Sequence, residues 1–240
     1  MTATLTKSWT PRIARVCEID PAGCLFHVGS PNENFRVTRL GGEPDFLRQV
    51  LDAIEPGDTF FDVGASVGVV SVHARRRGAN VVAFEPEPTF RGRLRENLSL
   101  NEMSDVSVID WAVADRPGTL TLYTDGQHGT SPSLAATGER GAMHVAVDSI
   151  DAALTRGELP PPAVMKIDIE GAEVRAVRGM KRLLASGGRP RAVFVEVHPP
   201  MINDLGDDAD EMYAVFSEAG YRLVSESTRE AQVHHVWRAA

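Results

Sequence analysis

Cysteine, long apolar runs and clusters of positive charge are scarce in this sequence of 240 residues. The two cysteines, Cys17 and Cys24, cannot build a framework of several disulfides, and no group of Cys and His has zinc-finger spacing. No apolar run approaches the roughly 18 residues that a membrane span needs. Residues 1–15 lack the apolar stretch of a secretory signal. These absences predict a protein of the reducing cytosol without a membrane span.

Acidic residues outnumber basic ones, at 33 Asp and Glu against 25 Lys and Arg, which gives a net charge of −8. Non-specific binding of nucleic acid depends on a basic surface, so this charge argues against a nucleic-acid partner. Apolar residues make up 42% of the chain, which is enough to bury a core. The length suits one domain with a short extension.

The N-terminal part has a short β-like pattern, with turns at residues 20–23 and 30–32. Residues 1–43 are therefore predicted to form a loose lead-in and a small hairpin layer ahead of a main domain of residues 44–240. A helical period follows from Pro44 to Ile54. The predicted strands of the layer are RVCEI (15–19), CLFHV (24–28) and FRVTRL (35–40).

Strands and helices alternate through the main domain. Near-continuous apolar strands between helices predict an α/β fold with a doubly wound, mostly parallel sheet that is buried on both faces. The last two strands can form a hairpin, which would make one edge antiparallel. The predicted strands are 59–63, 80–86, 106–113, 119–124, 144–150, 163–171, 191–199, 221–227 and 231–239, and the predicted helices are 67–77, 89–100, a short one after 150, one ending at 184, and 207–220.

A glycine turn, DVGASVG, joins the first strand of the main domain to its helix. Gly64 and Gly68 allow a sharp turn and a close approach of the backbone to a ligand, and Asp62 precedes them. Ligands of such sheets bind beyond the carboxyl ends of the strands. Taken alone, the motif is equally well explained as an ordinary tight turn.

Glu85 ends the next strand, 23 residues after Asp62. A carboxylate at this place can accept hydrogen bonds from both hydroxyls of a ribose, so the pair of motifs indicates an adenosine site. The spacing G-x-x-x-G differs from the dinucleotide motif G-x-G-x-x-G. A carboxylate at Asp62 would repel a pyrophosphate but suit a cationic ligand, which favours S-adenosylmethionine (SAM) over NAD.

The same turn matches G-x-S-x-G, the nucleophile elbow of α/β-hydrolases, with Ser66 as the nucleophile. Asp168 and one of His198, His234 or His235 follow in the right order. Little chain precedes the turn to supply the strands and oxyanion loop of a hydrolase, and a hydrolase does not explain Glu85. The hydrolase stays a minor alternative.

Two further groups of polar residues end neighbouring strands. Asp168 and Glu170 alternate with apolar residues, as do Glu196 and His198, so each pair is expected on one face of its strand. In a doubly wound sheet these strand ends meet at the crevice beside the glycine turn. Surface polar residues at strand ends are the plain alternative, but their convergence favours a site.

Together, the motifs DVGASVG, FEPEP, TSPSL, MKIDIEGAE and VEVHP resemble those of the FkbM family of SAM-dependent methyltransferases. The resemblance runs from about Glu43 to His198. It implies a class I, Rossmann-like methyltransferase fold of seven strands with an antiparallel edge strand. It also implies O-methylation of a hydroxyl on a sugar, lipid or other small molecule.

The resemblance also implies residue roles. Asp62, Gly64, Ala65 and Gly68 would line the methionine end of SAM, and Ser66 stands where the family usually has Asn but still offers a hydrogen bond. Glu85 would hold the ribose. The remaining implied contacts are Asp110 or Trp111 beside the adenine and Asp168 near the transferable methyl group.

Two ways of activating the acceptor hydroxyl remain open. His198 is the candidate general base, oriented by Asp168 or Glu196, because an unperturbed imidazole titrates near neutrality. Alternatively, Asp168, Glu196 and His198 hold magnesium or manganese, which lowers the pKa of the hydroxyl. A SAM-binding module without catalysis is a further alternative. The acceptor pocket is expected to involve the loop 125–141 and the N-terminal layer.

Overall fold

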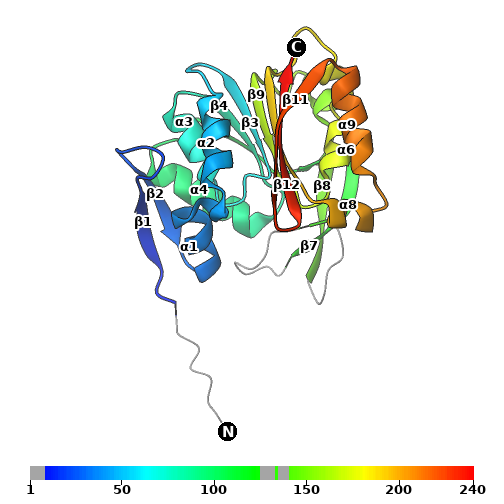
Figure 1. Ribbon diagram of the computed structural model, residues 1–240. Coiled ribbons are helices and arrows are strands. Elements are labelled where there is room, and N and C mark those ends of the chain that lie inside the picture. The colour runs from blue at the N-terminus through cyan, green and yellow to red at the C-terminus, as the bar shows by residue number, and fades with distance from the viewer. Residues whose placement is uncertain (1–8, 125–132, 135–140) are drawn as a thin grey trace.

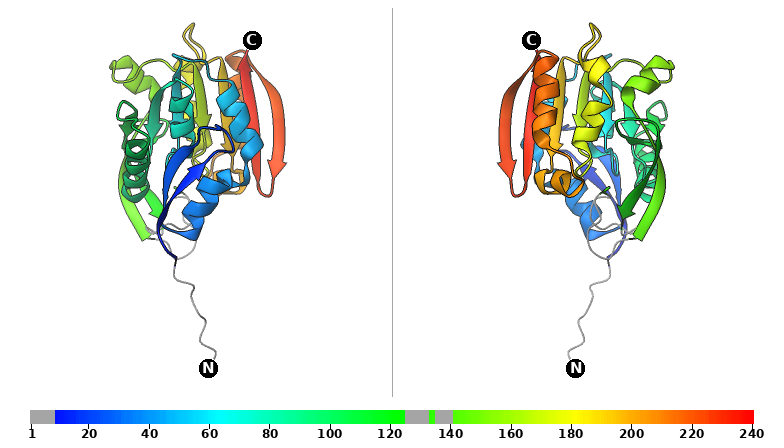
Figure 2. Two further views of the ribbon diagram at one scale, coloured as in Figure 1. Left: turned by 90° about the vertical axis from the view of Figure 1, so that its left-hand side faces the viewer. Right: turned by 90° about the vertical axis from the view of Figure 1, so that its right-hand side faces the viewer.

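The centre of the molecule is a seven-stranded sheet with helices on both faces (Figure 1, Figure 2). The computed structural model describes residues 9–124, 133–134 and 141–240. The sheet order β11-β12-β10-β9-β3-β4-β5 confirms the predicted doubly wound α/β fold. Its strands are β3 (Thr59–Val63), β4 (Asn80–Phe84), β5 (Ser107–Ile109), β9 (Val164–Ile167), β10 (Ala192–Val197), β11 (Tyr221–Arg229) and β12 (Gln232–Ala239).

The last two strands form the predicted hairpin. β12 pairs antiparallel with both β10 and β11, whereas β3, β4, β5, β9 and β10 pair in parallel. The antiparallel strand therefore lies one place in from the edge, and β11 at the edge runs parallel to the rest. This register places His234 on β12 directly opposite Glu196 on β10.

Two hydrophobic cores lie on opposite faces of the sheet because successive side chains of a strand alternate between its faces. Phe60 contributes to the first core, whereas its neighbour Phe61 contributes to the second. The first core is closed by α2 (Pro44–Asp52), α3 (Val69–Arg76) and α4 (Pro88–Leu100), and the second by α5 (Ile150–Thr155), α6 (Glu173–Arg178), α7 (Lys181–Leu184), α8 (Pro199–Asp204) and α9 (Ala209–Glu218).

The N-terminal layer contains a hairpin of β1 (Arg12–Val16) and β2 (Cys24–Val28), but not a third strand. β2 has the predicted bounds, whereas β1 begins and ends three residues before the predicted strand 15–19. The prediction of a strand over 35–40 is wrong, because α1 (Pro31–Thr38) and the short helix η1 (Leu40–Gly42) occupy that segment. Ser30 caps α1 by accepting the N–H of Glu33 at 3.1 Å, and Pro31 takes the first turn. These are strong helix-start signals that outweigh the β-like alternation of the residues after them.

Other predicted strands end earlier than expected. The strand 106–113 is broken after Ile109, and its second part, β6 (Ala112–Val113), joins a separate sheet of order β6-β8-β7. That sheet includes β7 (Gly118–Thr124) and β8 (Gly141–Asp148). The strands over 163–171 and 191–199 end at Ile167 and Val197, so Asp168, Glu170 and His198 lie in the connections that follow.

Two remaining expectations concern the helices and the loop. The helix expected to end at 184 is divided between α6 and α7 at Gly179–Met180. In the described parts of the chain, no helix combines the length and the apolar composition that a membrane span requires. Most of the predicted loop 125–141, including most of TSPSL, lies outside the described residues.

Helix α4 attaches the hairpin layer to the sheet through two asparagine side chains. Asn97 accepts the N–H of His27 at 2.8 Å and donates to the carbonyl of Val67 at 2.7 Å. Asn101 pairs with both backbone groups of Leu25. The hairpin and the sheet also share the first core, so the boundary between 1–43 and 44–240 stays a prediction.

We expect Asn97→Ala to lower the free energy of unfolding by about 2–5 kcal/mol, because one buried and one half-buried backbone group lose their partners. Denaturant unfolding followed by circular dichroism measures this loss. Ser99→Ala, on the exposed side of the same helix, is the control and should change stability by less than about 0.5 kcal/mol. Two separate transitions in the wild type would show that the hairpin layer unfolds on its own, contrary to this account.

Candidate active site

The turn between β3 and α3 brings two strand ends into direct backbone contact. Gly64 has a φ of 83°, and a Cβ atom on it would lie 1.9 Å from the carbonyl oxygen of Asp168. Gly68 has a φ of 87°, and its Cβ would lie 2.4 Å from Cδ1 of Leu94. Glycine is required at both positions, because a side chain would strain the backbone and push these segments apart.

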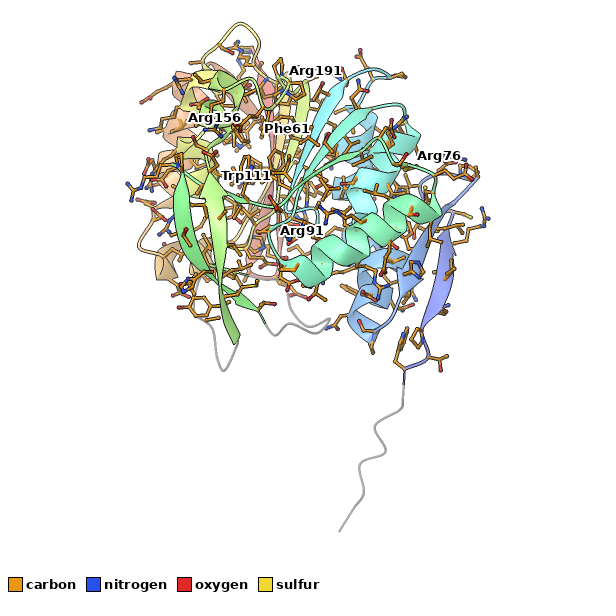
Figure 3. All side chains as sticks on the ribbon, turned by 180° about the vertical axis from the view of Figure 1, so that it is seen from behind. Phe61, Arg76, Arg91, Trp111, Arg156 and Arg191 are labelled. Atoms are coloured by element: carbon orange, nitrogen blue, oxygen red, sulfur yellow. The ribbon has the colours of Figure 1, made fainter. Side chains whose placement is uncertain are left out.

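Glu85 is fixed beside this turn by two backbone amides. Its Oε2 accepts the N–H of Ser66 at 2.8 Å and its Oε1 accepts the N–H of Glu87 at 2.9 Å. Arg91 on α4 donates to the carbonyl oxygens of Glu85 and Pro86, which holds the end of β4 in place (Figure 3). The side chain is therefore rigid, and each carboxylate oxygen keeps a second lone pair for a ligand.

Glu85 lines the smaller of two connected chambers, a slot of about 70 Å³ with apolar walls. Trp111 forms one wall and packs edge-to-face on Phe84 at a ring distance of 5.2 Å. Asp110 is exposed and lies outside the lining of the slot, so of the two residues proposed beside an adenine only Trp111 is near. Burial raises the pKa of Glu85 to about 7, although the two amides act against it.

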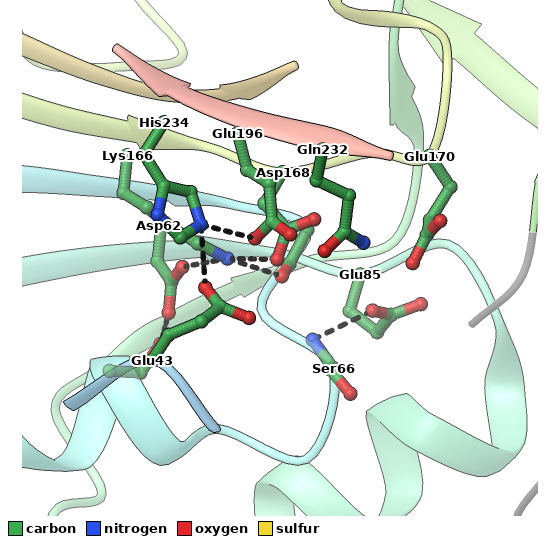
Figure 4. A network of polar contacts seen from close by, with 12 residues as sticks. Glu43, Asp62, Ser66, Glu85, Lys166, Asp168, Glu170, Glu196, Gln232 and His234 are labelled. Carbon is green, nitrogen blue, oxygen red and sulfur yellow. Dashed lines mark hydrogen bonds and ion pairs between the residues drawn. The ribbon is translucent and has the colours of Figure 1, made fainter. Parts of the chain in front are cut away.

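Lys166, inside the otherwise apolar strand β9, connects the acids beneath the turn (Figure 4). Its Nζ lies 3.0 Å from Oδ2 of Asp168, 3.6 Å from Oδ1 of Asp62 and 3.2 Å from the carbonyl oxygen of Gly64. Asp62 has no exposed surface, and its Oδ2 accepts a hydrogen bond from Ser71 at 2.6 Å. The structure thus places Asp62 under the turn, where it supports Lys166 rather than facing either chamber.

The pKa values of this trio follow from its geometry. Burial tends to lower the pKa of Lys166, but Asp168 and Asp62 outweigh it and hold that pKa above its usual range. Burial raises the pKa of Asp62 despite Lys166. Burial likewise opposes ionisation of Asp168, but Lys166 and His198 prevail and lower its pKa. Lys166 and His198 therefore favour the ionised form of Asp168.

The larger chamber is a cavity of about 450 Å³ that shares the residues at the turn with the slot. Its walls are formed by helices α1, η1 and α2, the β3–α3 turn, the ends of β9 and β10, and the β11–β12 hairpin. Asp168 and Glu170 line both chambers and mark their junction. Other lining residues are Phe35, Glu43, Phe46, Ala65, Lys166, Glu196, Arg229 and Gln232.

His198 lies behind the acids rather than on the wall of the cavity. It is 3% exposed, and its Nδ1 lies 2.8 Å from Oε1 of Glu173. Its Nε2 lies 3.5 Å from Glu170 and 3.7 Å from Glu196. Burial acts to lower the pKa of His198, but Glu173 and the other acids raise it to about 10. At neutral pH this imidazole is a buried cation, which is not a proton acceptor.

Glu196 faces the cavity between two imidazoles. Its oxygens lie 3.7 Å from Nε2 of His198 and 3.8 Å from Nε2 of His234, which is longer than a normal hydrogen bond. Burial, with a smaller contribution from Asp168, raises the pKa of Glu196 to about 8.

The sequence analysis assigned no role to Lys166 or Glu43. A charged residue within an apolar strand was the available signal for Lys166, whereas nothing local distinguishes Glu43.

Ser66 lacks the partner that a nucleophilic serine requires. Its φ is 52°, and its Oγ is buried with no hydrogen-bond partner among the described residues. Nucleophilic catalysis needs an imidazole within hydrogen-bond reach of that oxygen. His198 and His234 instead pair with glutamates, and His235 pairs with Tyr213. This geometry argues against the hydrolase alternative.

The fold and the chambers at the strand ends define a SAM-dependent methyltransferase of class I. The model of the FkbM methyltransferase domain matches residues 62–223. The chain therefore belongs to the FkbM methyltransferase family, as its motifs predicted.

Relatives of known name agree with this assignment. The chain is 30% identical to hexuronic acid methyltransferase AglP of Haloferax volcanii, over 93% of this chain and 87% of the relative. It is 26% identical to 31-O-demethyl-FK506 methyltransferase FkbM of Streptomyces tacrolimicus, over 83% of this chain and 86% of that protein. The crystal structure of methyltransferase FkbM from Methylobacillus flagellatus has a similar fold, with a TM-score of 0.50 at 16% identity, covering 86% of this chain and 52% of that one.

Binding of S-adenosylhomocysteine, the demethylated cofactor, should depend on the ionisation of Glu85. Because the carboxylate is the form that accepts two amides and a ligand, affinity should weaken as the pH falls through about 7, by up to roughly tenfold per pH unit. Calorimetry between about pH 6 and about pH 8 measures this dependence. The Glu85→Gln variant should bind S-adenosylhomocysteine roughly 10–100-fold more weakly, and its affinity should not change with pH in this range. The control variant Glu55→Gln, at an exposed position, should keep the wild-type pH dependence. A slope that survives in Glu85→Gln would assign it to another group.

Proposed function

We propose that this enzyme transfers the methyl group of SAM to a hydroxyl oxygen of a small molecule, with a sugar as the acceptor. The observation that carries the proposal is the pair of chambers that meet at Asp168, one a narrow slot with a carboxylate and an indole, the other a wide cavity with acidic walls. A nucleoside cofactor and a separate acceptor need this arrangement.

The cofactor would span the junction. Its adenine would lie in the slot against Trp111, and its ribose hydroxyls would donate to the fixed carboxylate of Glu85. The methionine part would pass over Gly64 and Ala65 into the larger cavity. Asp168, ionised and at the junction, would attract the positive charge of the sulfonium.

Methyl transfer requires the acceptor oxygen, the methyl carbon and the sulfur to lie in line. The oxygen lone pair forms the new bond to carbon, the electrons of the carbon–sulfur bond stay on sulfur, and the hydroxyl proton is released. Positioning of the two reactants can contribute up to about 7–11 kcal/mol. Glu196 would serve the acceptor, because it lines the cavity and the nearest imidazole nitrogens lie 3.7 and 3.8 Å from its carboxylate. His198 would act as a positioning cation for Glu170 and Glu196, in place of the base proposed from the sequence.

A sugar acceptor fits the walls of the larger cavity. Phe35 on α1 is 47% exposed and lines the cavity, where it offers an aromatic face. Arg229 and Gln232 from the β11–β12 hairpin add polar groups to the lining. Sugars present both an apolar ring face and hydroxyls, and the named substrate of one relative is a hexuronic acid. A cytosolic location remains part of the proposal. So does the absence of a nucleic-acid partner, which agrees with the net charge of −8.

The test is methyl transfer from labelled SAM to a panel of methyl hexosides and methyl hexuronosides. We expect labelled product from at least one sugar, together with binding of S-adenosylhomocysteine and none of NAD. Asp168→Asn should lower kcat by roughly 10²-fold or more, because the charge at the junction is lost. The control Asp204→Asn, on the exposed side of α8, should match the wild type. Cofactor binding without transfer to any hydroxyl of the panel would refute a sugar acceptor, and failure to bind the cofactor would refute the proposed site.

A further inference from the structure

Three side chains from separate elements converge on the wall of the larger cavity: Glu43 before α2, Glu196 on β10 and His234 on β12 (Figure 4). Nε2 of His234 lies 3.1 Å from Oε2 of Glu43 and 3.8 Å from Oε2 of Glu196. Glu43 and Glu196 both line the cavity. One atom of each residue thus faces a common point at the edge of the cavity.

A second contact orients each of the three groups. Oε1 of Glu43 accepts a hydrogen bond from Arg229 at 2.7 Å, which leaves Oε2 for the cluster. The ring of His234 stacks on Phe46 with a centroid distance of 4.1 Å and an interplanar angle of 6°. Oε1 of Glu196 faces His198. Metal-binding side chains in proteins are commonly oriented by such outer contacts.

The environment of His234 is the observation that points to a ligand. Its side chain is 7% exposed, and among the described residues Nε2 makes no hydrogen bond of normal geometry, although two carboxylates are near. A simple ion pair would direct an N–H at one oxygen. Ligand atoms about 2.1 Å from an ion and roughly 90–110° apart lie about 3.0–3.4 Å from one another. The distance of 3.1 Å from His234 to Glu43 lies in this range, whereas the 3.8 Å from His234 to Glu196 would have to shorten slightly around an ion.

We propose that Glu43, Glu196 and His234 bind one divalent cation, with manganese as the best fit. Carboxylates suit magnesium and manganese, and an imidazole ligand shifts the preference toward a first-row metal. Three protein ligands leave coordination positions open toward the cavity. This inference deepens the proposed function, on which it rests: a hydroxyl bound there ionises more readily, and Glu196 acts on the acceptor through the ion.

The other cluster of possible ligands is Asp168, Glu170 and His198. The ammonium of Lys166 lies 3.0 Å from Asp168 and repels a cation there. Both ring nitrogens of His198 already have protein partners, Nδ1 at 2.8 Å from Oε1 of Glu173 and Nε2 at 3.1 Å from Nε2 of Gln232. The ion is therefore assigned to the cluster around His234, which shares only Glu196 with the metal site proposed from the sequence.

The test is titration of the chelator-treated full-length chain with manganese chloride, with free Mn²⁺ followed by electron paramagnetic resonance. We expect one bound ion per chain. Glu43→Gln and His234→Gln should weaken binding by roughly tenfold or more, whereas the exposed control His144→Gln should not. Bound Mn²⁺ should raise the melting temperature of the wild type but not of the two variants.

Electron spin echo modulation on the wild type keeps the test independent of variant folding. Coupling of bound Mn²⁺ to an imidazole nitrogen is expected, and its absence would overturn the proposal. Loss of binding in Asp168→Asn but not in Glu43→Gln would also overturn it, in favour of the other cluster. Calorimetry of S-adenosylhomocysteine binding in metal-free buffer distinguishes failure of the cation site from failure of the proposed function. If the chain binds the cofactor but binds no Mn²⁺, the cation site is refuted and the proposed function stands.

Discussion

The buried ammonium of Lys166 is the interaction on which the site depends. It reaches the end of β3 through Gly64 and Asp62, and the end of β9 through Asp168. Two carboxylates this close in a buried position would repel each other, and the cation between them offsets that cost. The same contact requires the close approach at Gly64, where a Cβ would lie 1.9 Å from a carbonyl oxygen. The junction between the two chambers follows from these constraints.

The same principle recurs around the larger cavity, where cations hold acids that would otherwise separate. His198 stands among Glu170, Glu173 and Glu196, and Arg229 holds Glu43. As a result, the carboxyl groups of Glu43, Glu170 and Glu196 are held in fixed positions on the wall of the cavity. Such a wall suits a cofactor with a sulfonium, and it offers oxygen ligands where the acceptor would lie.

The fold was largely predictable from sequence, because apolar strands alternate with helices and each strand pattern is local. The adenosine motif was equally visible, since Gly64 and Glu85 end consecutive strands. Helix α1 was missed although Ser30 gave a helix-start signal. The behaviour of His198 was not predictable, because its raised pKa arises from Glu173, Glu170 and Asp168, which lie on a different segment of the chain. Glu43 is far from Glu196 in sequence, and only the sheet register and the N-terminal layer bring them together.

The central claim is that one cofactor spans both chambers, and a crystal structure of the complex with S-adenosylhomocysteine tests it most directly. The account predicts the adenine against Trp111, both ribose hydroxyls within about 2.6–3.2 Å of the carboxylate of Glu85, and the sulfur at Asp168 facing the larger cavity. An adenosine bound away from Trp111 and Glu85, or a sulfur turned away from the larger cavity, would contradict it.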